Sequence, residues 1–219
     1  MKKLTKVQYT SQNIKAMDKV KRLHLINSIT GIKPANLVGT ISADGTENLA
    51  IFSSVVHLGS NPPLIGFVLR PHFEFRRDTY NNLDTLGYYT INHVPAHLTE
   101  QAHYTSAKFD QTVSEFERCG FTPQYFSEFP APFVAESLVK IGLKKVNEIP
   151  IPDNGTMLII GQIELIEVPN YIDDQNGKLN LEQLQVAGIS GLNTYYKMTQ
   201  VGDYPYARVE EVPAFDKVK

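Results

Sequence analysis

Residues 36–82 read NLVGTISADGTENLAIFSSVVHLGSNPPLIGFVLRPHFEFRRDTYNN, and this stretch decides the fold. The apolar, β-branched run at 37–42 predicts a buried strand. Residues 43–46 predict a hairpin turn, because Gly45 can adopt the positive φ that such a turn requires. A return strand is expected over 48–58, so the stretch opens with an antiparallel hairpin.

The second half of the stretch predicts a corner, a third strand and a helix. Pro62 and Pro63 are expected to form an extended corner, since each fixes its own φ and disfavours a helical residue before it. Residues 64–70 then form a strand that ends at Arg70, and residues 88–94 form another. Between these strands, helical spacing is carried by Phe75, Thr79, Leu83 and Leu86.

Two placements within this stretch are unusual. Ser53 and Ser54 fall in the middle of an expected core strand, either as tolerated small residues or as room for a ligand. Arg76 and Arg77 fall in the first turn of the expected helix, where the helix dipole favours anions. They are either solvated surface charges or, with Thr79, a site for an anion such as phosphate.

The flanking sequence supplies more strands and short helices. Residues 11–21 predict a helix with Ser11 as its N-cap, and the alternating LHLIN at 23–27 favours a strand. Residues 95–122 are helical in pieces with Gly120 as a stop, and two long β-rich runs flank a turn at 152–155. About seven strands with antiparallel turns indicate a mainly β Greek-key barrel with inserted helices.

Composition excludes several classes of function. The chain has 219 residues, 42% hydrophobic and 20% charged, with a net charge of -2, and no basic field that would indicate nucleic-acid binding. No apolar run is long enough to span a membrane, and the start of the chain lacks the pattern of a signal peptide. The single Cys119 cannot form an internal disulfide, so a cytoplasmic, single-domain protein is expected.

The motifs of hydrolytic, nucleotide-binding and metal chemistry are missing. Six histidines occur, but Pro95 interrupts the helix that would bring His93 and His97 to one face, so no metal site is expected. Neither a GxSxG nor a GxGxxG motif occurs. This disfavours a hydrolase and leaves open a flavin enzyme, whose cofactor carries the chemistry.

The segments NLVGTISADGTENLAIFSSVVHLGSNPPLIGFVLRP, RRDTYNNL and YYTINHV, taken in order, closely resemble the flavin reductase-like, FMN-binding split-barrel family. That family includes flavoredoxins and the reductase components of two-component monooxygenases. The resemblance implies an FMN-binding split β-barrel over residues 1–219, with a core at about 22–168 and a C-terminal extension at 169–219. It also implies a homodimer with FMN near the subunit interface.

The resemblance assigns residues to the flavin. The strand from Ala50 to Ser54 would touch it, with the backbone of Ile51, Phe52 and Ser53 at the isoalloxazine edge and both serine hydroxyls at the ribityl-phosphate. Four residues would serve the phosphate: Arg76, Arg77, Thr79 and Asn82. Asn48, His57 and Arg70 are further candidates.

The function that follows is an FMN-binding oxidoreductase, as an NAD(P)H-dependent flavin reductase or a flavoredoxin-like electron carrier. Its partners would be a monooxygenase or another electron acceptor, and NAD(P)H would be a co-substrate, although no residues for NAD(P)H can be named. The alternative is a non-catalytic β-barrel protein that binds a flavin or another aromatic cofactor.

Overall fold

The structure is a computed structural model that describes residues 5–71, 78–126, 128–170 and 177–215. Its centre is a seven-stranded, entirely antiparallel sheet in the order β3-β2-β6-β9-β10-β5-β4. The strands are β2 (Asn36–Ile41), β3 (Glu47–Phe52), β4 (Val56–Ser60), β5 (Pro63–Leu69), β6 (Tyr88–His93), β9 (Lys140–Ile151) and β10 (Thr156–Glu167). The predicted mainly β split-barrel fold is therefore confirmed.

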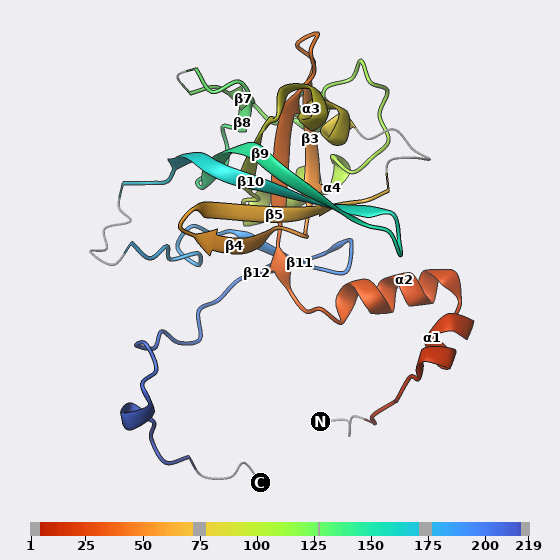
Figure 1. Ribbon diagram of the computed structural model, residues 1–219, viewed down its shortest axis with the longest axis vertical. Coiled ribbons are helices and arrows are strands. Elements are labelled where there is room, and N and C mark those ends of the chain that lie inside the picture. Colours follow the sequence, from red (N-terminus) through yellow and green to blue (C-terminus); the bar gives the residue numbers. More distant parts are fainter. Residues whose placement is uncertain (1–4, 72–77, 127, 171–176, 216–219) are drawn as a thin grey trace.

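The remaining elements are short and lie around this sheet (Figure 1). Two smaller sheets contain β1 (Lys33–Pro34), β11 (Ala187–Ser190) and β12 (Thr194–Lys197), and β7 (Pro123–Gln124) and β8 (Phe133–Val134). The helices are α1 (Ser11–Ala16), α2 (Lys19–Ser28), α3 (Asp78–Leu86), η1 (Ala96–Leu98), α4 (Thr99–Tyr104), α5 (Glu115–Cys119) and η2 (Val209–Glu211). No helix in the described ranges is long and apolar enough to cross a membrane.

The predicted hairpins form because their turns contain the residues that the geometry demands. Ile41 pairs with Glu47 across the first turn, and Gly45 has φ of 89°. Thr156 pairs with Ile151 across the second, where Gly155 has φ of 70°. The positive φ values suit glycine because it has no Cβ to clash with the backbone.

Alternation along the strands builds two cores, one on each face of the sheet. Val38, Phe67 and Tyr89 belong to the cluster inside the barrel. Leu37 and Leu49 face outward and pack with Phe116 of α5 and with Phe121. Because side chains alternate between faces, strand β2, which is buried from Asn36 to Thr40, contributes to both cores.

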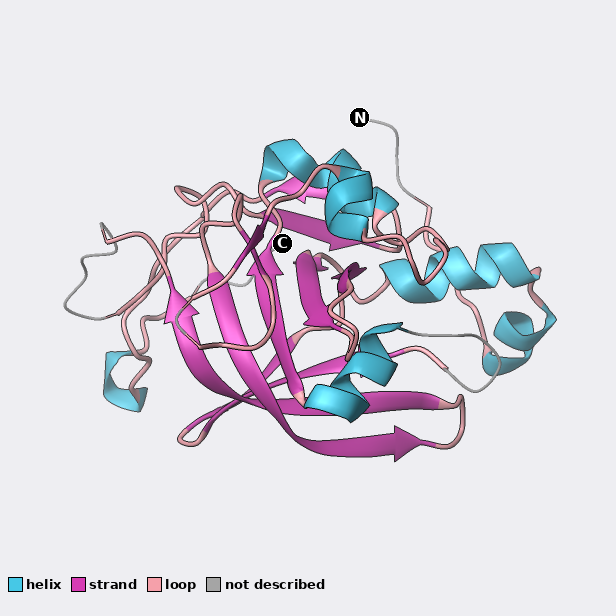
Figure 2. Ribbon diagram, turned by 90° about the horizontal axis from the view of Figure 1, so that it is seen from above, coloured by secondary structure: helices cyan, strands magenta, loops and turns pink. Residues whose placement is uncertain are grey.

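The sheet curls strongly (Figure 2), and side-chain contacts bring the end of β3 to β5 near the opposite edge. β3 and β4 follow one another in the chain but lie at opposite edges of the sheet. Phe52 of β3 meets Phe67 of β5 with ring centroids 5.0 Å apart. Ser54 Oγ donates to the Val68 carbonyl and accepts from the Val68 amide, both at 3.0 Å. This contact helps to close the barrel.

The expectation of one continuous strand over 48–58 is wrong. The strand ends at Phe52 and a new one begins at Val56, so Ser53 and Ser54 lie in the break between them. The chain leaves the first edge here and crosses to the second. The prediction of an extended corner at Pro62 and Pro63 is also wrong. Ser60 pairs with Pro63, so this segment is the reverse turn of the β4–β5 hairpin.

The N-terminal prediction needs two corrections. The residues LHLIN belong to α2 rather than to a strand, because the Asp18 carboxylate accepts from the amides of Val20 and Lys21 and starts a new helix. The N-cap of α1 is Thr10 rather than Ser11. Neither helix buries a residue, and both extend away from the sheet in Figure 1.

Candidate functional site

A buried polar cluster joins the first hairpin to α3. Asn48 Nδ2 donates to Thr40 Oγ1 at 3.0 Å and to Thr79 Oγ1 at 3.3 Å. Asn82 Nδ2 also donates to Thr40 Oγ1, at 3.0 Å. All four side chains are at most 8% exposed, with Thr40 fully buried. Three residues that the sequence nominated separately therefore meet in one place.

Thr40 completes this cluster and was missed by reasoning from the sequence. It occupies an inward position on β2, directly opposite Asn48 in the strand register. A single threonine in a β-branched run carries no signal of its own. Its pairing with Asn48 across the Gly45 turn could have been found by counting residues from that turn, because hairpin register follows turn length.

Among the described strands, β3 pairs only with β2, so its other backbone edge is left without a partner strand. The Leu49 amide points to this edge, where it donates to the Glu115 carboxylate at 3.0 Å. Backbone groups alternate in direction along a strand, so Ile51 faces the same edge while Phe52 faces β2. No hydrogen bond to the Ile51 backbone occurs at this edge in the described part of the chain, which leaves polar groups free for a ligand.

The two serines differ sharply. The Ser54 hydroxyl donates its only proton to the Val68 carbonyl and accepts a hydrogen bond from the Val68 amide. It therefore has no proton left to donate to a phosphate. Ser53, also partly buried, makes no side-chain hydrogen bond within the described ranges. The structure thus gives Ser54 a role in closing the barrel and leaves the Ser53 hydroxyl free.

The other nominated residues are more scattered. Ala50 lies on β3 between Asn48 and Phe52 and, like them, faces the inside of the barrel. His57 is exposed on the edge strand β4, and Arg70 is exposed just after β5. Arg76 and Arg77 lie outside the described residues.

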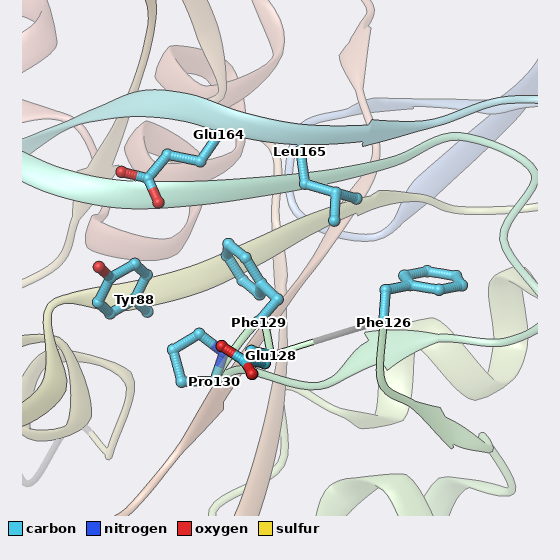
Figure 3. A pocket seen from close by; sticks show the side chains of 7 residues that line it. All are labelled: Tyr88, Phe126, Glu128, Phe129, Pro130, Glu164 and Leu165. Carbon is cyan, nitrogen blue, oxygen red and sulfur yellow. The ribbon is translucent and has the colours of Figure 1, made fainter.

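Two surface pockets lie away from the polar cluster. One, of about 270 Å³, is formed under β10 by an aromatic loop (Figure 3). It is lined by Tyr88, Phe126, Glu128, Phe129, Pro130, Glu164 and Leu165. The other, of about 560 Å³, is lined by Glu100, Gln101, Tyr104, Ala107, Phe109, Arg118 and Cys119. Neither pocket includes a nominated flavin residue.

Burial controls the protonation of two side chains near the barrel. It lowers the pKa of His93 to about 4, so this imidazole is neutral at physiological pH. It also raises the pKa of Tyr89, whose hydroxyl is fully buried. Within the described ranges, no group of three His, Cys, Asp or Glu side chains could hold a metal ion.

A curled antiparallel sheet whose free strand edge adjoins a buried polar cluster defines a split-barrel protein with a candidate ligand site. Comparison with known proteins specifies the family. The family model described as "Flavin reductase like domain" matches residues 32–185. The chain therefore belongs to the flavin reductase-like family, and this membership supports flavin-linked oxidoreductase chemistry.

Individual proteins agree with this assignment. An uncharacterized protein of Aquifex aeolicus is 30% identical over 166 residues, which cover 75% of this chain and 84% of that protein. A solved structure from Shewanella frigidimarina NCIMB 400, provisionally described as a flavin reductase with a split barrel domain, is 42% identical. It has a TM-score of 0.87 and covers 92% of this chain and 100% of its own.

A more distant structure shares the fold alone. Nitrilotriacetate monooxygenase component B from Bacillus cereus is 18% identical, with a TM-score of 0.80. The match covers 92% of this chain and 100% of that one.

Proposed function

We propose that this protein is an FMN-dependent oxidoreductase that accepts electrons from NAD(P)H and passes them to an acceptor. The observation that carries the proposal is the buried cluster of Asn48, Thr79 and Asn82 at the start of α3, beside the free edge of β3. A bound flavin supplies the hydride chemistry, and the chain needs to bind and orient it.

The residues of the site fit the two ends of FMN. The backbone groups of Ile51 at the open edge of β3 suit the polar edge of a flat ring, as a strand edge suits any extended hydrogen-bonding partner. The free Ser53 hydroxyl just beyond the strand would add to this contact. Thr79 lies in the first turn of α3, where the helix dipole favours a phosphate. Arg76 and Arg77 would add charge-assisted bonds to that phosphate.

An anaerobic titration tests the ligand and the reaction together. We expect the purified protein to bind FMN, and NADH or NADPH to bleach the flavin absorption band at roughly 450 nm. Bound FMN that neither nucleotide bleaches would favour the non-catalytic binding protein or a carrier that takes electrons from another donor. A protein with no affinity for FMN up to high micromolar concentration would contradict the proposal.

The proposal extends to partners. We propose a homodimer, because α1 and α2 bury no residue and the tail at 201–215 is exposed throughout. A monooxygenase is a candidate acceptor by analogy with the Bacillus cereus component B. We also propose that the whole chain is one domain, with a core at about 22–168 and a C-terminal extension at 169–219.

A further inference from the structure

Helix α2 carries an apolar ridge that no described part of the chain covers. The ridge consists of residues spaced three apart, each at least 41% exposed: Val20, Leu23, Ile26 and, at the C-cap, Ile29. Residues three apart are neighbours on a helix surface, so these side chains form one strip. Because no residue of α2 is buried, this strip has apolar surface available for another chain.

The C-terminal tail at 201–215 is a second uncovered apolar segment, and all of its residues are exposed. Its apolar side chains, each at least 61% exposed, are Val201, Tyr204, Tyr206, Val209, Val212 and Phe215. The start of the tail is held to the body of the protein. The Gln200 amide donates to the Glu182 carboxylate at 2.8 Å, and Lys178 Nζ lies 2.9 Å from the Asp203 carboxylate. The tail is therefore anchored where it begins and uncovered beyond that point.

Both segments leave the body from one small sheet. Strand β1 follows α2 and strand β12 precedes the tail, and the two flank β11 in the order β1-β11-β12. Two strand spacings place β1 and β12 roughly 10 Å apart. From there α2 and the tail diverge on the lower side of the barrel in Figure 1. A second copy that approaches this side meets both segments.

The two segments carry opposite charge. Helix α2 contains three basic residues and no acidic one: Lys19, Lys21 and Arg22. The tail contains three acidic residues and one basic residue: Asp203, Glu210, Glu211 and Arg208. The charges of the tail therefore favour contact with α2 and disfavour contact with a second tail.

Some of these charges already have partners inside the chain. Arg22 Nη1 donates to the Lys15 carbonyl at 3.1 Å, and Arg208 Nη1 lies 4.0 Å from Glu211 Oε1. Three others form no ion pair within the described ranges: Lys19 and Lys21 on the helix and Glu210 on the tail. These three are the charges most available to another subunit.

We propose that the tail of each subunit lies along α2 of the other subunit, with its apolar side chains on the ridge and its acidic residues beside the lysines. The contact is reciprocal, because each subunit of a C2 dimer offers both surfaces. Helix α2 has 10 residues, so helix and tail together supply about 25 residues a side, within the roughly 20–30 of a stable interface. This inference rests on the homodimer proposed above and adds which surfaces meet.

Two charge-reversal variants distinguish an exchanged tail from one that docks on its own helix. The helix variant carries Lys19→Glu and Lys21→Glu, and the tail variant carries Glu210→Lys and Glu211→Lys. Each variant alone brings like charges together at both contacts, so its dimer should be weakened by about tenfold. All four substituted residues are exposed, so both variants should fold.

The decisive measurement is a mixture of the two variants. A heterodimer pairs the reversed helix with the reversed tail and the wild-type helix with the wild-type tail, so both contacts regain opposite charges. We expect heterodimers to outnumber both homodimers in native mass spectrometry. Sedimentation of the mixture should give a dissociation constant within about twofold of the wild-type value.

Glu128→Lys with Glu164→Lys is the matched control. These residues are exposed and line the pocket of Figure 3, and their reversal changes the net charge as much as the tail variant does. The control should dimerise as the wild type does. Mixed with the helix variant, it should not form heterodimers in preference to homodimers.

Three outcomes overturn the inference. The mixed variants could show no preference for heterodimers, which is the result for a tail that docks on its own helix. The reversals could leave the dissociation constant of the dimer unchanged, or the control could weaken the dimer as much as the tail variant. Failure of the proposed homodimer is distinguishable and also overturns the inference, since the wild-type protein would then sediment as a monomer.

Discussion

At the scale of single residues, the adjacent Ser53 and Ser54 have different roles. Ser54 is bonded twice to the backbone of Val68, whereas Ser53 is bonded to nothing through its side chain in the described part of the chain. A hydroxyl that bonds both the N–H and the C=O of a residue in another strand takes the place of the backbone hydrogen bonds that a paired strand would make. Position 54 therefore serves the closure of the barrel.

Ser54→Ala should lower the free energy of unfolding by about 1–3 kcal/mol, because the Val68 amide and carbonyl lose their partner. Urea denaturation measures this change. Ser53→Ala is the matched control and should change stability by less than about 0.5 kcal/mol. Equal losses in both variants would contradict the closing role of Ser54.

His93 makes stability depend on pH. Its pKa is about 4 in the folded chain, against an ordinary value of 6.5. Between these values the unfolded chain binds a proton that the folded chain does not, so stability rises with pH and is lost as pH falls from about 6.5 to about 4.

We expect the His93 contribution to reach about 1–3 kcal/mol, measured by denaturation at a series of pH values. His93→Gln removes the ionisable group and should flatten the profile in this range by that amount. If the free energy of unfolding of His93→Gln keeps the wild-type dependence on pH, the dependence comes from other groups.

At the scale of secondary structure elements, the interior of the barrel depends on a pair of complementary positions. Tyr89 of β6 reaches across β9 to Gly161 of β10, where a Cβ atom would overlap the Tyr89 hydroxyl and lie 2.8 Å from Cζ. The Tyr89 hydroxyl is buried and has no hydrogen-bond partner among the described residues. The glycine makes room for the ring, and the hydroxyl remains a cost to stability.

Gly161→Ala should destabilise the protein by about 1–3 kcal/mol through overpacking, and Tyr89→Phe should relieve part of that loss. A double-mutant cycle measured by thermal denaturation gives the coupling. Gly59→Ala is the control, because its Cβ would meet only the Pro62 carbonyl at 3.5 Å. Additive effects at positions 89 and 161 would contradict direct contact.

At the scale of the whole molecule, two projecting segments, α2 and the C-terminal tail, expose apolar side chains. The exposed apolar side chains of α2 include Val20 at 57% and Leu23 at 46%. In the tail, Tyr204 and Tyr206 are 81% and 87% exposed. Such surface on an otherwise well-packed chain is typical of contacts between subunits, and C2 dimers are the commonest arrangement.

Sedimentation should give a dimer, twice the 24.6 kDa of the chain. Deleting 204–219 keeps the ion pair between Lys178 and Asp203, and should weaken dimerisation by about tenfold or more because it removes exposed aromatic anchors. The melting temperature of the monomer should not change. A wild-type protein that stays monomeric over a wide concentration range would contradict the homodimer.

The sequence alone determined the local geometry of this protein and its family. Gly45, Gly120 and Gly155 marked positions of positive φ that the structure has, and about seven strands with antiparallel turn signals indicated a barrel. These features are readable because turns and strand faces depend on residues close together in the chain. The order of motifs across 36–94 was enough to identify the flavin reductase-like family.

Only the tertiary structure decided which polar groups meet and which hydroxyl is free. Asn48 meets Thr79 from 31 residues away, and Thr40 meets Asn82 from 42. Ser54 finds Val68 only when the sheet has curled. Hydrogen-bond capacity is a property of the atom, but the choice of partner depends on strands and helices that come together only in the folded chain.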